Sequence, residues 1–141
     1  LNYQRIFEKI RVRTPEANDL TPGLLPALQV WGAIQSIPEA GLAIVNVGKR
    51  DISYDMELPI PELSFRPGID ITPQTLHEDF EVYELNDQHA YVKIPEQNKY
   101  RVGDLFAFGI SHPCTTFDKW RLLYLVDDNY RVTGGIRTFL A

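Results

Sequence analysis

The stretch ALQVWGAIQSI, residues 27–37, alternates the apolar residues Leu28, Val30 and Ile34 with the polar residues Gln29 and Gln35. An alternation of period two is typical of a β-strand that buries one face and leaves the other polar. A short apolar run, GLAIVNVG at residues 41–48, follows after a turn of Pro, Glu, Ala and Gly. The pattern from residue 26 onward therefore predicts a sheet.

Further short strands are expected along the rest of the chain, separated by polar turns such as residues 86–87 and 127–129. The candidate stretches are DFEVYEL (79–85), HAYVKI (89–94), DLFAFGIS (104–111), WRLLYLV (120–126) and YRVT (130–133). The proline-rich stretch LPIPELSFRPGIDITP (58–73) is expected to be a long connection across the surface. Closely spaced short strands of this kind predict a mainly β fold, either an antiparallel sandwich or a barrel-like domain.

The first residues follow a different period. In NYQRIFEKIRVRT, residues 2–14, apolar residues recur at the spacing of one helical face, and the pattern stops before Pro15. We therefore expect an N-terminal helix and connecting loop over residues 1–25 and a single β domain over residues 26–141. Because the chain starts at Leu1 without an initiator methionine, it is expected to be part of a longer polypeptide.

Composition narrows the class of function. The 141 residues carry 14 Lys and Arg against 19 Asp and Glu, a net charge of −5, so no basic surface is expected for nucleic acid. No apolar run approaches the length of a membrane-spanning helix, and the first residues do not show the pattern of a signal peptide. A single cysteine excludes an internal disulfide and fits a cytoplasmic protein.

The stretch GISHPCTTFDKW, residues 109–120, contains that only cysteine, Cys114, two positions after His112. On an extended backbone, residues i and i+2 point to the same side, so both side chains are able to bind one metal ion. An imidazole and a thiolate suit zinc, and two protein ligands leave positions open for water or substrate, as in a catalytic site. Two other interpretations stay open: a buried thiol beside a half-exposed histidine, and a cysteine nucleophile activated by His112.

The segments AIVNVGKRDISYD, LNDQHAYVKI and GDLFAFGISHPCTTFDKWR resemble the C-terminal domain of the D-serine dehydratase and D-threonine aldolase family. The similarity runs from about residue 26 to the end and is closest to the branch called amino acid deaminases. The resemblance implies that His112 and Cys114 bind zinc. It also implies a fold-type III enzyme whose pyridoxal phosphate and Schiff-base lysine lie on an N-terminal (β/α) barrel, which this chain lacks.

The resemblance implies a lyase that removes ammonia from D-serine or a related D-β-hydroxy amino acid, with the metal acting on the β-hydroxyl. Its expected partners are its own barrel, a second subunit and a small D-amino acid, and the chain alone is expected to be inactive. One alternative is an aldolase of the D-threonine type. Another is a non-catalytic β-rich domain that binds a ligand or a protein.

Several other residues are candidates to support the site. In NVGKRDISYD, Lys49, Ser53 and Asp55 either assist the metal centre or form a solvated turn after a strand. His89 is either a group near the metal or an ordinary strand histidine, and Asp118 is either the carboxylate that orients His112 or a surface residue. Both tryptophans, Trp31 and Trp120, lie in strand patterns and are expected in the core.

Overall fold

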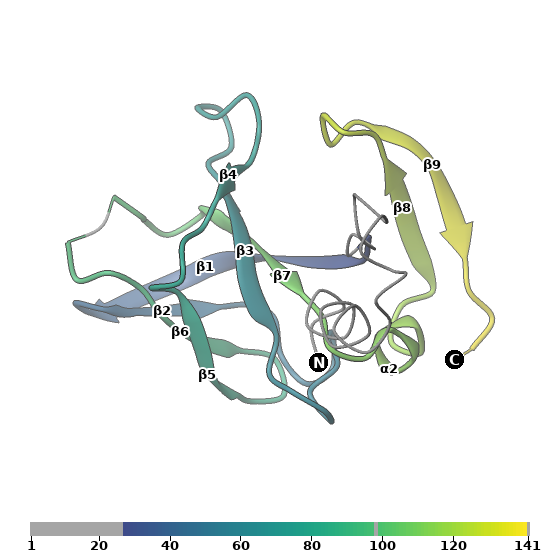
Figure 1. Cartoon of the computed structure of the whole chain (residues 1–141), viewed down its shortest axis with the longest axis horizontal. Coiled ribbons are helices and arrows are strands. Elements are labelled where there is room, and N and C mark those ends of the chain that lie inside the picture. Colours follow the sequence, from purple (N-terminus) through teal and green to yellow (C-terminus); the bar gives the residue numbers. More distant parts are fainter. Residues whose placement is uncertain (1–26, 98, 141) are drawn as a thin grey trace, which may run out of the picture.

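The computed structural model describes residues 27–97 and 99–140 of the chain (Figure 1). The predicted N-terminal helix over residues 1–25 lies outside the described residues. Within them, the prediction of a mainly β antiparallel fold is confirmed. None of the helices in the described part of the chain is long and apolar enough to cross a membrane.

Seven strands form one antiparallel sheet in the order β4-β3-β7-β1-β2-β6-β5. These strands are β1 (Gln29–Glu39), β2 (Leu42–Val45), β3 (Ile60–Phe65), β4 (Gln74–Thr75), β5 (Glu81–Leu85), β6 (Ala90–Lys93) and β7 (Leu105–Gly109). A short helix, α2 (Pro113–Phe117), follows β7 and leads into a separate hairpin of β8 (Leu122–Val126) and β9 (Val132–Arg137). Figure 1 shows this hairpin standing beside the curled sheet.

The core lies on one face of the sheet, and its pattern follows the alternation seen in the sequence. In β1, the side chains of Val30 and Ile34 are 6% and 1% exposed. Of the two glutamines of this strand, Gln29 is partly buried and Gln35 is exposed. The neighbouring strand β7 contributes Phe106 and Phe108, both fully buried. Antiparallel register places Val30 opposite Phe108, so the apolar faces of the two strands coincide.

The sheet is curled and not flat. This is seen from the contact between β3, next to one edge strand of the sheet, and β5, the strand at the other edge. Of the two architectures that the sequence predicted, the barrel-like one describes this half-closed sheet. The expectation that residues 58–73 form only a surface connection is wrong, because β3 lies inside this stretch and pairs with β7. The register of that pairing shifts between Pro61 and Leu63, and such an irregularity is where a strand tolerates proline.

A partly buried ion pair joins the C-terminal end of β3 to the N-terminal end of β7. Arg66 donates from Nε and Nη2 to the two carboxylate oxygens of Asp104, at 2.7 and 2.6 Å, and their side chains are only 22% and 4% exposed. Burial alone would raise the pKa of the Asp104 carboxyl, but hydrogen bonds from Arg66 and from the Arg101 N–H hold this pKa below its ordinary value. The pair therefore fixes two loops to the sheet.

The tryptophans differ from one another. Trp31 lies half-buried in β1, with its ring 5.5 Å from that of Tyr130 in an edge-to-face arrangement. Trp120 lies between α2 and β8, is 38% exposed, and donates from Nε1 to the carbonyl of Asp51 at 2.6 Å. The core prediction is therefore wrong for Trp120, because its indole N–H binds a loop at the surface.

The loop after β2 passes close over the turn between β5 and β6. The N–H groups of Lys49 and Arg50 donate to the carbonyls of Asn86 and Asp87 at 2.9 and 3.0 Å. A Cβ atom added to Gly48 would lie 2.4 Å from backbone atoms of Asp87, so only glycine allows this approach.

Replacing Gly48 by alanine should therefore lower the free energy of unfolding by about 1–3 kcal/mol, because two backbone segments must separate. Urea denaturation followed by tryptophan fluorescence measures this loss. The matched control is Gly134→Ala in β9, where the added Cβ meets nothing closer than 3.6 Å and stability should change by less than about 0.5 kcal/mol. Equal effects of both substitutions would contradict the close approach.

Candidate functional site

The sheet order brings two chain segments together at one edge. Strands β2 and β7 both flank β1 and both run antiparallel to it, so they are parallel to each other. Their carboxyl ends therefore meet at the same edge of the sheet. The loop of residues 46–59 leaves from β2 at this edge, and α2 leaves from β7. Residues 48–55 of the loop and residues 111–120 after β7 form the candidate site.

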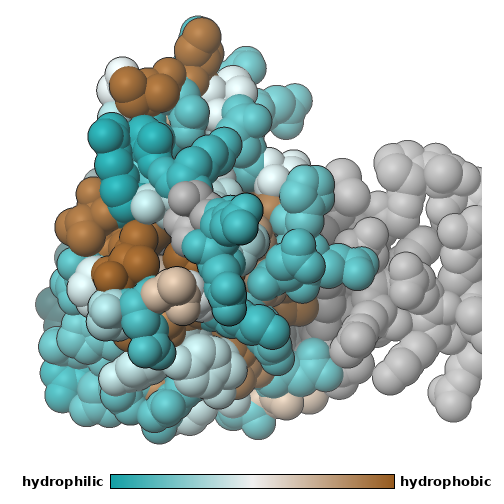
Figure 2. All heavy atoms as spheres, turned by 90° about the vertical axis from the view of Figure 1, so that its left-hand side faces the viewer, coloured by the Kyte–Doolittle hydropathy of each residue, from teal (hydrophilic) through white to brown (hydrophobic). Residues whose placement is uncertain are grey.

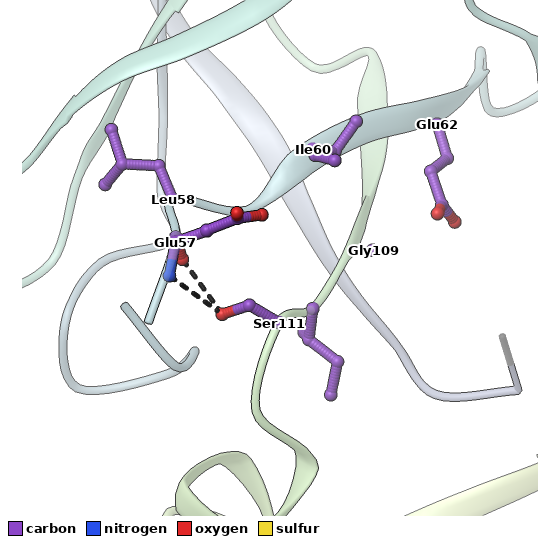
Figure 3. Close-up of a pocket in the computed structure, with 7 residues that line it drawn as sticks. Glu57, Leu58, Ile60, Glu62, Gly109 and Ser111 are labelled. Atoms are coloured by element: carbon purple, nitrogen blue, oxygen red, sulfur yellow. Dashed lines mark hydrogen bonds between the residues drawn. The ribbon is translucent and has the colours of Figure 1, made fainter. Parts of the chain in front are cut away.

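The strand end before the helix is held by a serine and a carboxylate (Figure 3). Ser111 Oγ donates to the carbonyl of Glu57 at 2.9 Å and accepts from the N–H of Glu57 at 3.4 Å. The Glu62 carboxylate lies over Gly109, where an added Cβ would lie 2.1 Å from Oε1. Burial raises the pKa of Glu62, against the effect of a hydrogen bond from Gln29. The backbone is thereby fixed on both sides as it approaches His112.

His112 is the N-cap of α2, with an extended backbone, and Pro113 and Cys114 already belong to the helix. The extended backbone on which the zinc argument depends therefore ends at His112. Proline fixes φ at a value suited to the first helical position and needs no hydrogen-bond acceptor there. The N–H of Asp118 then donates to the carbonyl of Cys114 at 3.2 Å. The strand argument for placing the two side chains on one side therefore does not hold.

Two residues of the loop fix His112. Its backbone N–H donates to Ser53 Oγ at 3.2 Å, and its ring Nδ1 lies 2.6 Å from Asp55 Oδ2. The other oxygen of Asp55 accepts from Thr115 Oγ1 at 3.0 Å. The hydrogen bond to His112 is the largest of the effects that hold the pKa of Asp55 below its ordinary value. Within the described part of the chain, Nε2 of His112 has no hydrogen-bond partner.

A buried polar contact lies beneath the pair of His112 and Asp55. The N–H of Ser53 donates to Thr116 Oγ1 at 3.0 Å, with the two residues 1% and 0% exposed. Together with the bond from Trp120 to the carbonyl of Asp51, this contact attaches the loop along the whole length of α2. The position of the His112 ring therefore depends on groups that belong to the core.

The predicted supporting residues divide into two groups. Ser53 and Asp55 lie in direct contact with His112. Asp118 is the C-cap of α2, and the carboxylate beside the imidazole is that of Asp55. Lys49 extends over the ring of Tyr54, 5.5 Å from its centroid, and His89 Nε2 lies 2.8 Å from Gln35 Oε1 on β1.

Cys114 is exposed, so the interpretation of a buried thiol is wrong. No group of three or more His, Cys, Asp or Glu side chains that could hold a metal is present within residues 27–97 and 99–140. If a metal binds here, these residues supply fewer than three such ligands, and the site would be an open one. Thr115 and Thr116 were not predicted as site residues. Their only signal in the sequence is their place directly after Cys114.

Comparisons with known proteins agree with this fold and place the chain in a family. Residues 27–126 match the family described as "Putative serine dehydratase domain". Because this match covers most of the chain, the chain belongs to that family. No curated protein matches the sequence.

Two solved structures are similar in fold. The first is the crystal structure of D-threonine aldolase from Filomicrobium marinum, with a TM-score of 0.62 and 17% identity over 89% of this chain and 29% of that one. The second is a cysteine-to-alanine mutant of D-threo-3-hydroxyaspartate dehydratase in its metal-free form. It has a TM-score of 0.60 and 14% identity over 79% of this chain and 32% of that one. The present chain thus spans about a third of each.

Replacing Thr116 by valine keeps the shape of the side chain but leaves the buried N–H of Ser53 without its acceptor. We expect a loss of about 1–3 kcal/mol in the free energy of unfolding, measured by urea denaturation. The control is Thr133→Val in the exposed hairpin, where the hydroxyl donates to the carbonyl of Leu125 and its loss should cost little. An unchanged stability in Thr116→Val would show that the buried contact does not hold the loop to the helix.

Proposed function

We propose that this chain is the zinc-binding domain of a pyridoxal phosphate-dependent lyase that removes ammonia from D-serine or a related D-β-hydroxy amino acid. Membership of the serine dehydratase domain family supports the class of reaction. The contact between His112 Nδ1 and Asp55 is the observation that carries the assignment of the site. Histidines that bind metals commonly donate their second ring N–H to a carboxylate or a carbonyl.

The residues present fit zinc as an open site. With Nδ1 bound to Asp55, the remaining ring nitrogen, Nε2, is the one available to a metal, and the thiol of Cys114 is exposed two residues further on. Imidazole and thiolate together favour zinc over the harder divalent cations. The remaining coordination positions are open to water, to substrate or to a group from elsewhere in the enzyme.

The residues of this domain have defined tasks in the proposed reaction. Asp55 would accept a hydrogen bond from Nδ1–H of His112, which would leave the lone pair of Nε2 available to bind a metal. Thr115 restrains the same carboxylate, and Ser53 fixes the backbone of His112. When bound, zinc would supply a Lewis acid for the substrate β-hydroxyl, and pyridoxal phosphate on another domain would supply the electron sink.

An aldolase is the second candidate. The fold similarity to D-threonine aldolase is as high as that to the dehydratase, and both reactions act on a β-hydroxy amino acid. Cys114 inclines the proposal toward the dehydratase, because the resemblance implies zinc where the second metal ligand is a cysteine.

The domain that carries pyridoxal phosphate is also the proposed partner of the β8–β9 hairpin. A two-stranded sheet is only marginally stable in water without a packing partner. In the described chain, large side chains on both strands of this hairpin are exposed, including Tyr124, which is 68% exposed, and Val132, which is 62% exposed. A covering domain would remove that apolar surface from water.

Titration of the purified chain with zinc should show one site per molecule, and cobalt should give the near-ultraviolet absorption of a metal–thiolate bond. His112→Ala should weaken zinc binding by at least tenfold, and Cys114→Ser should abolish the thiolate absorption. His77→Ala, which alters an exposed histidine elsewhere, is the control and should bind as the parent does. Parental zinc affinity in both site variants would overturn the proposed metal site.

Replacing Asp55 by asparagine should weaken zinc binding by about 10- to 100-fold, because the carboxylate orients His112 without touching the metal. Isothermal titration calorimetry measures the affinity. The matched control is Asp118→Asn, which changes the exposed carboxylate at the other end of α2 and should leave the affinity unchanged. The reverse order of effects would mean that Asp118, and not Asp55, orients the imidazole.

A further inference from the structure

A cavity lies at the opposite end of β3 and β7 from His112. It measures about 240 Å³ and is formed by the turn after β3 and the loop before β7. The side chains that matter most are Phe65, Arg66, Ile69, Asp70, Lys99 and Tyr100. Figure 2 views the molecule from the left of Figure 1, and hydrophobic spheres stand at the top of this face, where the β3–β4 loop lies.

The cationic groups of this cavity have unused donors. Arg66 gives Nε and Nη2 to Asp104, and Nη2 also donates to the carbonyl of Lys99 at 2.5 Å. No described residue accepts a hydrogen bond from its Nη1, and the Lys99 ammonium likewise has no partner among residues 27–97 and 99–140. The guanidinium is held rigidly while one of its nitrogens stays free.

Besides Asp104, which pairs with Arg66, the cavity is lined by the carboxylate of Asp70. Its Oδ2 accepts the backbone N–H of Arg66 at 2.7 Å, and its own N–H donates to the carbonyl of Arg66 at 2.9 Å. Gly68, with φ +78, allows the tight turn that returns Asp70 to the cavity. The second oxygen, Oδ1, accepts no hydrogen bond from the part of the chain that the structure describes. The carboxylate is thus fixed in place with one oxygen available.

The remaining wall is apolar. Phe65 and Tyr100 are half-buried, and the Tyr100 ring packs edge-to-face against Phe106, with centroids 5.2 Å apart. Ile69 is 66% exposed at the rim. The volume of the cavity lies below the range of about 300–1,000 Å³ that is typical for drug-sized ligands. The cavity therefore suits a small molecule with an apolar part.

We propose that this cavity binds a free α-amino acid in its zwitterionic form, with an apolar side chain. Lys99 and Nη1 of Arg66 would take the carboxylate, Asp70 would take the ammonium group, and Phe65, Ile69 and Tyr100 would contact the side chain. Because Asp104 already pairs with Arg66, the charges left to a ligand are chiefly those of Lys99 and Asp70, and a ligand that carries both an anionic and a cationic group complements both. This inference does not rest on the proposed lyase function.

Binding is tested on the full chain by isothermal titration calorimetry with leucine, in both D and L forms. Two analogues each remove one charge: N-acetylleucine lacks the ammonium group and leucinamide lacks the carboxylate. At least one form of leucine should bind, and each analogue should bind about tenfold more weakly or worse, the cost of losing one charge-assisted hydrogen bond.

Lys99→Met and Asp70→Asn should each weaken leucine binding by a similar factor. Lys93→Met removes an exposed lysine of β6 as the matched control, and His112→Ala separates this cavity from the proposed metal site. Both controls should bind leucine as the parent does. Absence of leucine binding, equal binding of the two analogues, or parental affinity in Lys99→Met and Asp70→Asn would overturn the proposal.

Discussion

The buried hydrogen bond from the Ser53 N–H to Thr116 Oγ1 joins the two segments on which the candidate site depends. Each segment alone is short: one is a loop without regular structure and the other a helix of five residues. Helices of that length are not stable by themselves in water, so α2 depends on its contacts with the loop. The same loop presents Asp55 to His112. The geometry of the site thus follows from a contact in the core.

The topology of the sheet explains why these segments meet at all. Two parallel strands separated by one antiparallel strand must end at the same edge, and here β2 and β7 enclose β1. The close backbone approach at Gly48 and the hydrogen bonds of Ser111 then restrict where each segment goes after its strand. The opposite end of β3 and β7 is fixed separately, by the partly buried pair of Arg66 and Asp104. The proposed metal site and the cavity beside Arg66 are therefore held by different groups.

The sequence predicted the elements whose side chains alternate between core and solvent, since that period directly reflects burial. It failed for β3, where prolines concealed a strand that accommodates Pro61 through a shift in register. It also failed for the backbone at Cys114, because Pro113 begins a helix as readily as it ends a strand. Ser53 and Asp55 were predicted through family resemblance. Thr116 was not predicted, because no local pattern shows that a threonine after Cys114 will reach a loop more than sixty positions earlier.

The central claim is that Asp55 fixes the His112 imidazole with its proton on Nδ1, so that Nε2 is left unprotonated with a free lone pair. Heteronuclear nuclear magnetic resonance, with the histidine nitrogens labelled by ¹⁵N, reports which ring nitrogen carries the proton in the neutral form. The account predicts the Nδ1–H tautomer for His112 in the metal-free chain, and a loss of this preference in Asp55→Asn. An Nε2–H tautomer for His112 in the parent chain would contradict it.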